Sequence, residues 1–312
     1  MIRSYTIETV PGALWDECFR NNEPLGPFLT YRWHRLWYDV FGWRERSCIL
    51  SLHDTCIAPF IRNGATLSFS GGVEITDYLD IIGPHGDKER AWDDIRVWAG
   101  NQGITELSLH NVPASSPTVA YFSRQPNDAS RISVVQEDTT PKMSLPTSWD
   151  AFETSLPRHA RHELRRKIRL IESKYPDATI KQSHNPKGDM PTFLELMATD
   201  EHKASFLTPA MRTFFLTLPG VFPTELSLQF LQIGNNRVAG ILFFILNDTL
   251  YLYNSGADSI RYSMAGFYLT AKSIGYAIGK GLQTYNFLQG SERYKYNLGG
   301  NDFLVNMIRE SF

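Results

Sequence analysis

Two stretches of the sequence repeat one order of expected elements: three strands, a helix and a fourth strand. The later stretch alternates apolar and polar residues, turns at Gly234 and then changes to a helical spacing. Its elements are expected at 226–233, 238–246, 250–253, 264–279 and 284–288. The earlier elements are expected at 47–52, 56–61, 66–69, 90–100 and 105–110, and helical segments at 31–41 and 192–218 precede the two stretches. A repeat this long predicts duplication of one domain, whereas a solenoid needs several shorter units.

The order of these elements also predicts the fold class and the domain boundaries. Each stretch is expected to form a mainly antiparallel meander followed by a helix and a strand, which makes the chain α/β with mixed, α+β-type sheets. A chain of 312 residues has the length of about two domains of roughly 150 residues each. We expect an N-terminal domain at 1–135, a linker at 136–148 and a C-terminal domain at 149–312. Part of the linker can add an edge strand.

Composition excludes several classes of protein. With 42% hydrophobic residues and a formal net charge of -2, the chain can bury a large core, and any phosphate contact requires a local basic patch. Cys18, Cys48 and Cys56 lack CxxC spacing, which predicts buried free thiols. The histidines show no ligand spacing, so no metal is expected. Residues 1–12 do not resemble a secretion signal, and the longest apolar run, 238–246, is too short to cross a bilayer, so a cytoplasmic location is expected.

The segment 155–175 predicts a strongly basic amphipathic helix. One side of this helix carries Arg158, Arg161, His162, Arg165 and Arg169. Two interpretations remain open. Charged rows on helices usually face water. Alternatively, the clustered arginines bind an anionic partner such as the diphosphate of coenzyme A, a nucleotide-linked acceptor or the backbone of tRNA.

A glycine-containing loop at 254–266 leads into the expected helix of the later stretch. Free backbone N–H groups and the positive end of the helix dipole suit a phosphate or a developing oxyanion there, and Arg261 adds a formal charge. The alternative is a loop that only caps the helix through Ser263.

Glu292, Tyr294 and Lys295 follow the last expected strand of the later stretch. The carboxyl ends of strands are a common place for reactive groups in α/β sheets. From the spacing alone, a surface ion pair between Glu292 and Lys295 is the favoured alternative.

These residues together resemble the GNAT-type acyltransferase domain of CelD-like proteins. The resemblance rests on the succession Tyr253, Gly256, Asp258, Tyr262, Gly266, Gly281, Phe287, Gly290, Glu292, Tyr294 and Lys295. The basic run 164–169 matches the arginine-rich opening of that domain, and 75–80 matches a motif of its N-terminal half. The chain is also similar to the Fem peptidyltransferases, which have tandem GNAT-like halves and use aminoacyl-tRNA.

The resemblance implies an N-acyltransferase that uses acyl-CoA and acts on an amine of a small molecule, a sugar or an amino-acid-type acceptor. Lys295 is then expected to stabilise the tetrahedral oxygen, with Glu292 or Asp258 handling the amine proton. The donor is expected to contact Arg261, Ser263, Gly266, Arg161 and Arg165. Tyr253 and Tyr294 are expected to line the acyl slot, and Asp77 and Tyr78 to face the acceptor.

Two alternatives remain open. The first is a Fem-like transferase that uses aminoacyl-tRNA, bound through the basic helix at 158–169. The second is a non-catalytic binding module of the same fold. It is motivated by Asn286, which stands where the motif usually has Asp, and by Ala265, which stands where it usually has Pro.

Overall fold

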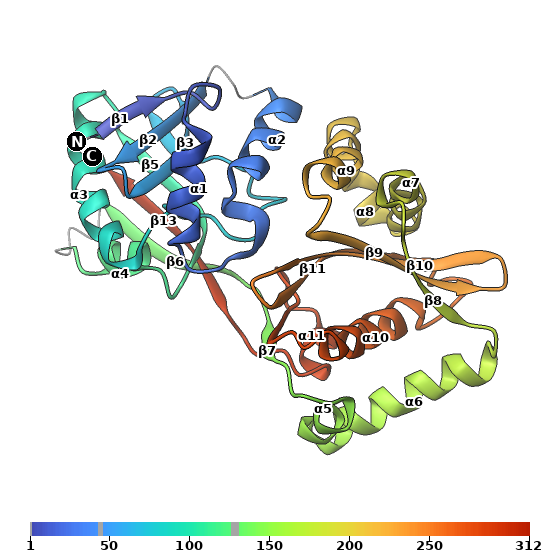
Figure 1. The fold of residues 1–312 in the computed structure, drawn as a ribbon. Coiled ribbons are helices and arrows are strands. Elements are labelled where there is room, and N and C mark those ends of the chain that lie inside the picture. The colour runs from blue at the N-terminus through green and yellow to red at the C-terminus, as the bar shows by residue number, and fades with distance from the viewer. Residues whose placement is uncertain (1, 43–45, 126–130) are drawn as a thin grey trace. The chain divides into compact units, whose positions relative to one another are not determined.

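The chain forms two compact units in the computed structural model, which describes residues 2–42, 46–125 and 131–312 (Figure 1). The first unit comprises Met1–Thr140 and Phe303–Phe312, and the second comprises Pro141–Asp302. Each unit is built on one mixed β-sheet.

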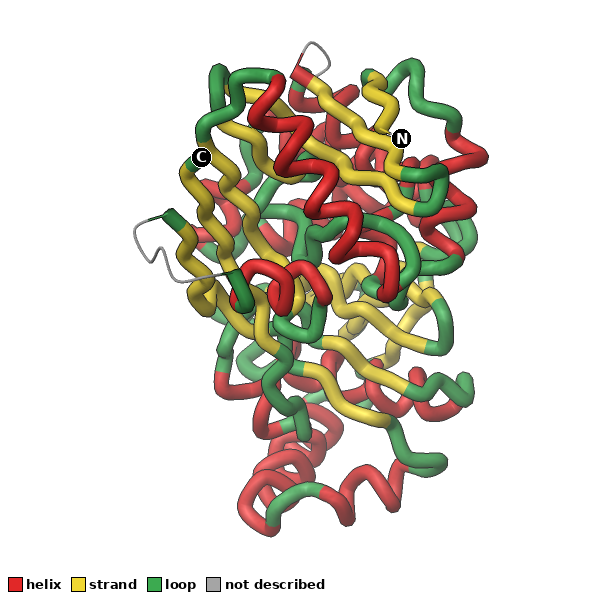
Figure 2. The backbone as a smooth tube through the Cα atoms, turned by 90° about the vertical axis from the view of Figure 1, so that its left-hand side faces the viewer, coloured by secondary structure: helices red, strands yellow, loops and turns green. Residues whose placement is uncertain are grey.

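The first unit has a seven-stranded sheet in the order β1-β2-β3-β4-β5-β13-β6. Its strands are β1 (Ile2–Tyr5), β2 (Ser47–Leu52), β3 (Cys56–Asn63), β4 (Thr66–Phe69), β5 (Glu106–Pro113), β6 (Ile132–Thr139) and β13 (Leu304–Ser311). Its helices are α1 (Gly12–Arg20), α2 (Tyr31–Phe41), α3 (Lys88–Asn101) and α4 (Pro117–Ser123), with 3-10 turns at Gly26–Leu29 and His85–Asp87. Helices α3 and α4 cover one face of the sheet (Figure 2). Trp92 of α3 and Phe122 of α4 belong to the core beneath them.

The second unit has a six-stranded sheet in the order β7-β12-β11-β10-β9-β8. Its strands are β7 (Lys142–Ser144), β8 (Thr179–Gln182), β9 (Leu226–Ile233), β10 (Asn236–Leu246), β11 (Thr249–Ala257) and β12 (Thr284–Asn286). Helices α5 (Trp149–Ser155), α6 (Arg158–Lys174) and α10 (Ala265–Gly279) lie on one side of this sheet (Figure 1). Helices α7 (Pro186–Met197), α8 (Glu201–Phe206) and α9 (Pro209–Val221) lie on the other side, and the short α11 (Arg293–Asn297) follows β12.

The predicted duplication is confirmed in the strand order of the two sheets. In each unit a three-stranded antiparallel meander is followed by a helix and a strand that pairs in parallel with the last strand of the meander. The meander turns form as the sequence indicates. His53 and Asp54, and likewise Asn247 and Asp248, have positive φ, as tight hairpin turns require. The predicted α/β class with mixed sheets is therefore correct.

The boundaries of the compact units differ from the domains expected from the sequence. The segment 136–148, expected as a linker, contains the end of β6 and the whole of β7, which is an edge strand of the second sheet. The chain leaves the second unit after Asp302, and its C-terminal strand β13 pairs with β5 and β6 of the first unit. This placement has a physical reason. Without β13, the backbone N–H and C=O groups of β5 on that side would lack strand partners, and β7 supplies such partners to β12 in the same way.

Candidate functional site

The two parallel strands of the second sheet separate at the site. Strands β11 and β12 are paired as far as Tyr251 and Asn286, where β12 ends. Strand β11 continues to Ala257 and there pairs only with β10 among the described strands. The pairing of β10 with β11 shifts register between Leu242 and Phe243. Tyr253 is therefore an extra residue of β11, which forms a β-bulge there. Such bulges occur often beside active sites, and here the bulge lies on an edge that β12 no longer covers.

Lys295 lies beside this edge and is buried, with 2% of its surface exposed. Its ammonium nitrogen Nζ donates to the backbone oxygens of Leu288, Gln289 and Gly290 at 3.1, 2.6 and 3.1 Å. It also lies 2.9 Å from Oε2 of Glu292, whose side chain is 57% exposed. Glu292 and Lys295 therefore form the expected ion pair. The pair does not lie wholly on the surface, because a turn of the backbone encloses the ammonium group of Lys295.

The turn that Lys295 holds has an unusual backbone conformation. Leu288 has φ 58° and Gly290 has φ 112°. The positive φ of residue 290 is one that side chains rarely adopt, so the motif glycine is required by the backbone conformation. The side-chain oxygen of Asn286 accepts the N–H of Leu288 at 2.9 Å. An amide oxygen accepts this hydrogen bond as a carboxylate oxygen would. Asn286, which stands where the motif usually has Asp, therefore preserves the turn.

Lys203 of α8 is a site residue that the sequence analysis missed. Its Nζ donates to the backbone oxygen of Ser255 at 2.5 Å. Burial lowers the pKa of Lys203, while the charges of Asp200 and Glu292 oppose that shift and the charge of Lys295 adds to it. The only local signal is Asp200, which caps α8 by accepting the backbone N–H of Lys203. Charge interactions link Lys203 with the Glu292–Lys295 pair, and these three residues are called the lysine–glutamate cluster below.

Two tyrosines predicted for the acyl slot lie close to this edge. The Tyr253 ring lies 5.8 Å from that of Phe215 and 5.6 Å from that of Phe244 between centroids. Tyr294 precedes Lys295 in α11, and burial raises the pKa of its hydroxyl, with a further rise from the charge of Glu292. Tyr253 thus packs with α9, whereas Tyr294 packs against the core formed with α6 and α10.

Asp258 lies apart from the lysine–glutamate cluster. Its carboxylate accepts the backbone N–H of Arg261 at 3.1 Å and faces the guanidinium of that residue at 3.8 Å. Both residues line a pocket of about 260 Å³ together with α7 and the start of β10. Asp258 is three residues beyond Ser255, about 10 Å along an extended strand. The structure therefore gives Asp258 the role of shaping the turn, and does not bring it to Lys295.

The entrance to α10 has no side-chain cap. Met264 is the N-cap residue, with φ 70°, and no side chain caps the helix. The alternative in which Ser263 merely caps α10 is therefore wrong. A Cβ on Gly266 would lie 3.3 Å from that of Ala257, so the glycine allows the helix to begin against β11. An uncapped helix start next to Arg261 can accept an anion.

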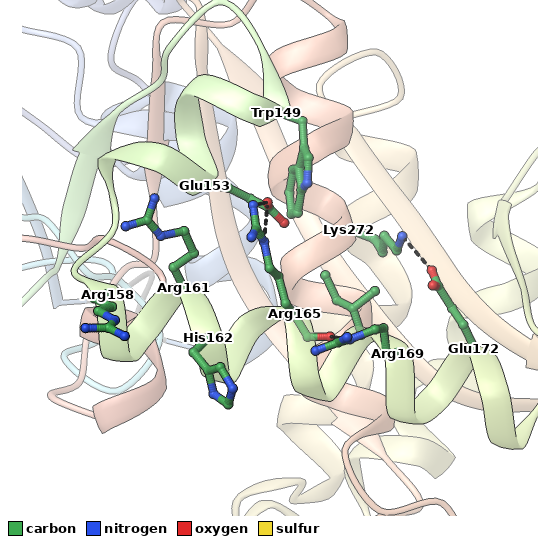
Figure 3. Close-up of a pocket in the computed structure, with 10 residues that line it drawn as sticks. Trp149, Glu153, Arg158, Arg161, His162, Arg165, Arg169, Glu172 and Lys272 are labelled. Carbon is green, nitrogen blue, oxygen red and sulfur yellow. Dashed lines mark hydrogen bonds and ion pairs between the residues drawn. The ribbon is translucent and has the colours of Figure 1, made fainter.

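Arg161 and Arg165 lie in a different pocket, lined by α5, α6 and α10 (Figure 3). The guanidinium of Arg165 is bound by the partly buried Glu153, at 2.8 Å from Nη2 and 2.9 Å from Nε. The α10 entrance lies instead against the end of α6, where the rings of Tyr175 and Tyr262 are 5.6 Å apart. Arg165 is about 15 Å from Tyr175 along the helix axis. Of the five residues predicted to hold the donor, Arg161 and Arg165 therefore line one pocket and Arg261 lines another, whereas Ser263 and Gly266 line neither of the two.

The predicted acceptor residues belong to the first unit and are buried. Tyr78 has no exposed surface, and its ring packs against Phe28 and Phe303. Asp77 is 8% exposed. The motif around them has a structural role, because Asp80 binds Lys88, Ser116 and Thr118. These contacts favour a packing role over contact with an acceptor.

No group of three or more His, Cys, Asp or Glu residues in the described part of the chain is placed to hold a metal ion. None of the described helices is both long and apolar enough to span a membrane. The three cysteines are buried and free, as the sequence predicts.

The comparison with family models provides the decisive observation. Residues 158–296 match the model described as an acetyltransferase (GNAT) domain. The second unit contains a GNAT domain. The resemblance inferred from the motifs is thereby confirmed, and the domain is of an acyltransferase kind. The comparison with curated proteins gives no significant match.

Solved structures of similar fold cover nearly the whole chain. The structure titled FemX is 11% identical, with 98% of this chain and 96% of that chain covered and a TM-score of 0.66. A conserved protein of unknown function from Bacteroides thetaiotaomicron is 12% identical, with complete coverage of both chains and a TM-score of 0.63. L-PGS from Bacillus licheniformis is 8% identical, with 97% and 92% covered and a TM-score of 0.62. At these identities the likeness concerns the fold alone, and it extends to both units.

Proposed function

We propose that this chain is an N-acyltransferase that moves an acyl group from acyl-CoA to an amine on a small molecule, a sugar or an amino-acid-type acceptor. The observation that carries the proposal is the open edge of β11 beyond Tyr251, bordered by the lysine–glutamate cluster. GNAT domains generally use acyl-CoA, and the match at residues 158–296 supports this donor.

The proposed reaction begins when the acceptor amine attacks the thioester carbonyl carbon. Glu292 accepts the amine proton, because its carboxylate is largely exposed and is fixed by Lys295. We propose that a backbone N–H of β11 on the edge without β12 donates to the tetrahedral oxygen; the N–H of Ser255 already donates to Oδ1 of Asn254 and is not counted. Collapse of the intermediate forms the amide bond, breaks the carbon–sulfur bond and releases coenzyme A, which takes up the proton as a thiol.

The contacts of Lys295 change the role that the resemblance implies for it. An ammonium group has three N–H donors, and Lys295 already faces three carbonyl oxygens and one carboxylate. It has no donor left for a tetrahedral oxygen in this arrangement. We therefore propose that Lys295 positions Glu292 and the turn 288–290, and that Lys203 adds positive charge to the cluster.

The donor phosphates are proposed to bind at the entrance to α10. Arg261 is 80% exposed there, and Ser263 and Gly266 precede and begin an uncapped helix. Tyr253 and Tyr294 are proposed to line the acyl slot. Arg161 and Arg165 are not included in this donor site because they line the other pocket.

A second candidate function is transfer of an aminoacyl group from tRNA. The observation that favours it is the basic face of α6, where Arg158, Arg161 and Arg169 have no acidic partner in the described part of the chain. A thermal-shift screen with acetyl-CoA, longer acyl-CoAs and aminoacyl-tRNA separates the candidates, because a donor raises the unfolding temperature. Stabilisation by an acyl-CoA supports the first function, and stabilisation by aminoacyl-tRNA alone replaces it with the second. Stabilisation by none of them indicates a non-catalytic module.

A further inference from the structure

The pocket between α5, α6 and α10 is the largest concentration of unneutralised positive charge among the described pockets. It has a volume of about 680 Å³. Its lining side chains are Trp149, Glu153, Arg158, Arg161, His162, Arg165, Ile168, Arg169, Glu172 and Lys272. Five of these are cations and two are carboxylates, in a chain whose formal net charge is -2. The charge is therefore local and belongs to this pocket.

Both carboxylates of the pocket are already neutralised. Glu153 binds Arg165, and Glu172 binds Lys272 at 2.9 Å (Figure 3). Of the remaining arginines, Arg158, Arg161 and Arg169 have no ion pair with any described acidic residue. Glu153 is 12% exposed and fixes Arg165 in place, which lowers the entropic cost of binding an anion there.

We propose that this pocket binds a nucleotide-type polyphosphate, at a site separate from the acyl donor. The guanidinium groups of Arg158, Arg161 and Arg169 offer N–H donors that match phosphate oxygens. The volume falls within the range of small-molecule pockets, roughly 300–1,000 Å³. Trp149 provides one ring face at the wall, which suits one base.

The lining favours a nucleotide over an RNA strand. Proteins that hold single-stranded nucleic acid stack successive bases on several aromatic side chains. This pocket has one aromatic side chain among its ten lining residues. The site is separate from the proposed donor site, because Arg261, Ser263 and Gly266 do not line this pocket. The proposal therefore goes beyond the proposed function and is tested by binding alone.

Calorimetric titration of the whole chain with inorganic pyrophosphate and tripolyphosphate, ADP and an RNA octamer tests the proposal at fixed ionic strength. We expect one tripolyphosphate per chain and tighter binding of ADP than of pyrophosphate, with that preference lost in Trp149→Leu. The double variant Arg158→Gln/Arg161→Gln should weaken binding about tenfold or more, since charge-assisted hydrogen bonds are lost. These two arginines have no structural partner, so the variant should fold normally.

Lys174→Gln is the matched control, because it removes one charge from the same helix outside the pocket. It should change affinity by less than about twofold. Absence of tripolyphosphate binding, or equal weakening by Lys174→Gln, would overturn the proposal. Tighter binding of the octamer than of ADP, lost in the double variant, would replace the nucleotide with RNA. Displacement of tripolyphosphate by acetyl-CoA would overturn the separate site and assign the pocket to the donor.

Discussion

The ammonium nitrogen of Lys295 lies 2.9 Å from the carboxylate of Glu292, and the two side chains differ sharply in exposure, at 3% and 57%. The buried cation thus holds an accessible carboxylate. This relationship assigns the two residues different tasks: Lys295 maintains the geometry, and Glu292 is able to meet a substrate.

Lys295→Met should destabilise the second unit by about 2–4 kcal/mol, because three backbone oxygens lose a buried charged donor. Glu292→Gln should change stability by less than about 1 kcal/mol, since the carboxylate is largely exposed. Urea denaturation of both variants measures the difference. Equal stability of the two variants would contradict the positioning role of Lys295.

Lys203 predicts a pH-dependent contribution to stability. Burial lowers its pKa in the folded state, so the folded chain binds fewer protons than the unfolded chain just below the ordinary lysine pKa of about 10.4. The free energy of unfolding of the wild type should therefore rise with pH in that window relative to Lys203→Met. Urea denaturation at several alkaline pH values checks this, with Lys280→Met as an exposed control. A difference that does not change with pH would show that the charge is not desolvated.

Asp80→Asn should destabilise the first unit by about 3–5 kcal/mol. Asp80 and Lys88 form a buried ion pair at 2.6 Å, with side chains 1% and 4% exposed, and loss of one partner leaves the other charge buried. Asp39→Asn, which alters the exposed pair with Arg35, should cost less than about 1 kcal/mol. Thermal or urea unfolding compares the two. Similar losses would show that the Asp80 network contributes little.

The buried His34 should make the protein less stable in mild acid. Its ring is fully buried, Nε2 has no partner among the described atoms, and burial lowers its pKa to about 3. Protonation of the unfolded chain below its pKa of about 6.5 should remove about 2 kcal/mol between pH 7 and pH 5. His34→Gln should remove this pH-dependent loss of stability, whereas the control His202→Gln, at an exposed position, should leave the loss unchanged. An unchanged pH profile in His34→Gln would contradict the assignment.

The repeated strand order could be predicted from the sequence because alternation, turn residues and helical spacing are local signals. Helix Tyr31–Phe41 and strands Ser47–Leu52 and Thr66–Phe69 have the expected bounds. The pairing of β13 with the first sheet could not be predicted, because it joins segments far apart in the sequence. Local patterns contain no information on such a partner.

The candidate site was predictable only where a motif lies within one segment. Glu292, Tyr294 and Lys295 are adjacent in sequence, and they remain together in the structure. Lys203 was missed because it joins the cluster from a separate helix. Asp258 and Arg161 were grouped with the cluster by chemistry, yet they line two other pockets.

The most direct test of the proposed acyl transfer is the release of free coenzyme A from acetyl-CoA and longer acyl-CoAs in the presence of a panel of amines. We predict release that depends on an amine, and a fall of about 100-fold or more in Glu292→Gln at unchanged stability, as expected for loss of a general base. Amine-dependent release that is equal in the wild type and Glu292→Gln would contradict the role of Glu292. No release with any amine, together with discharge of aminoacyl-tRNA by the same protein, would contradict the acyl-CoA account.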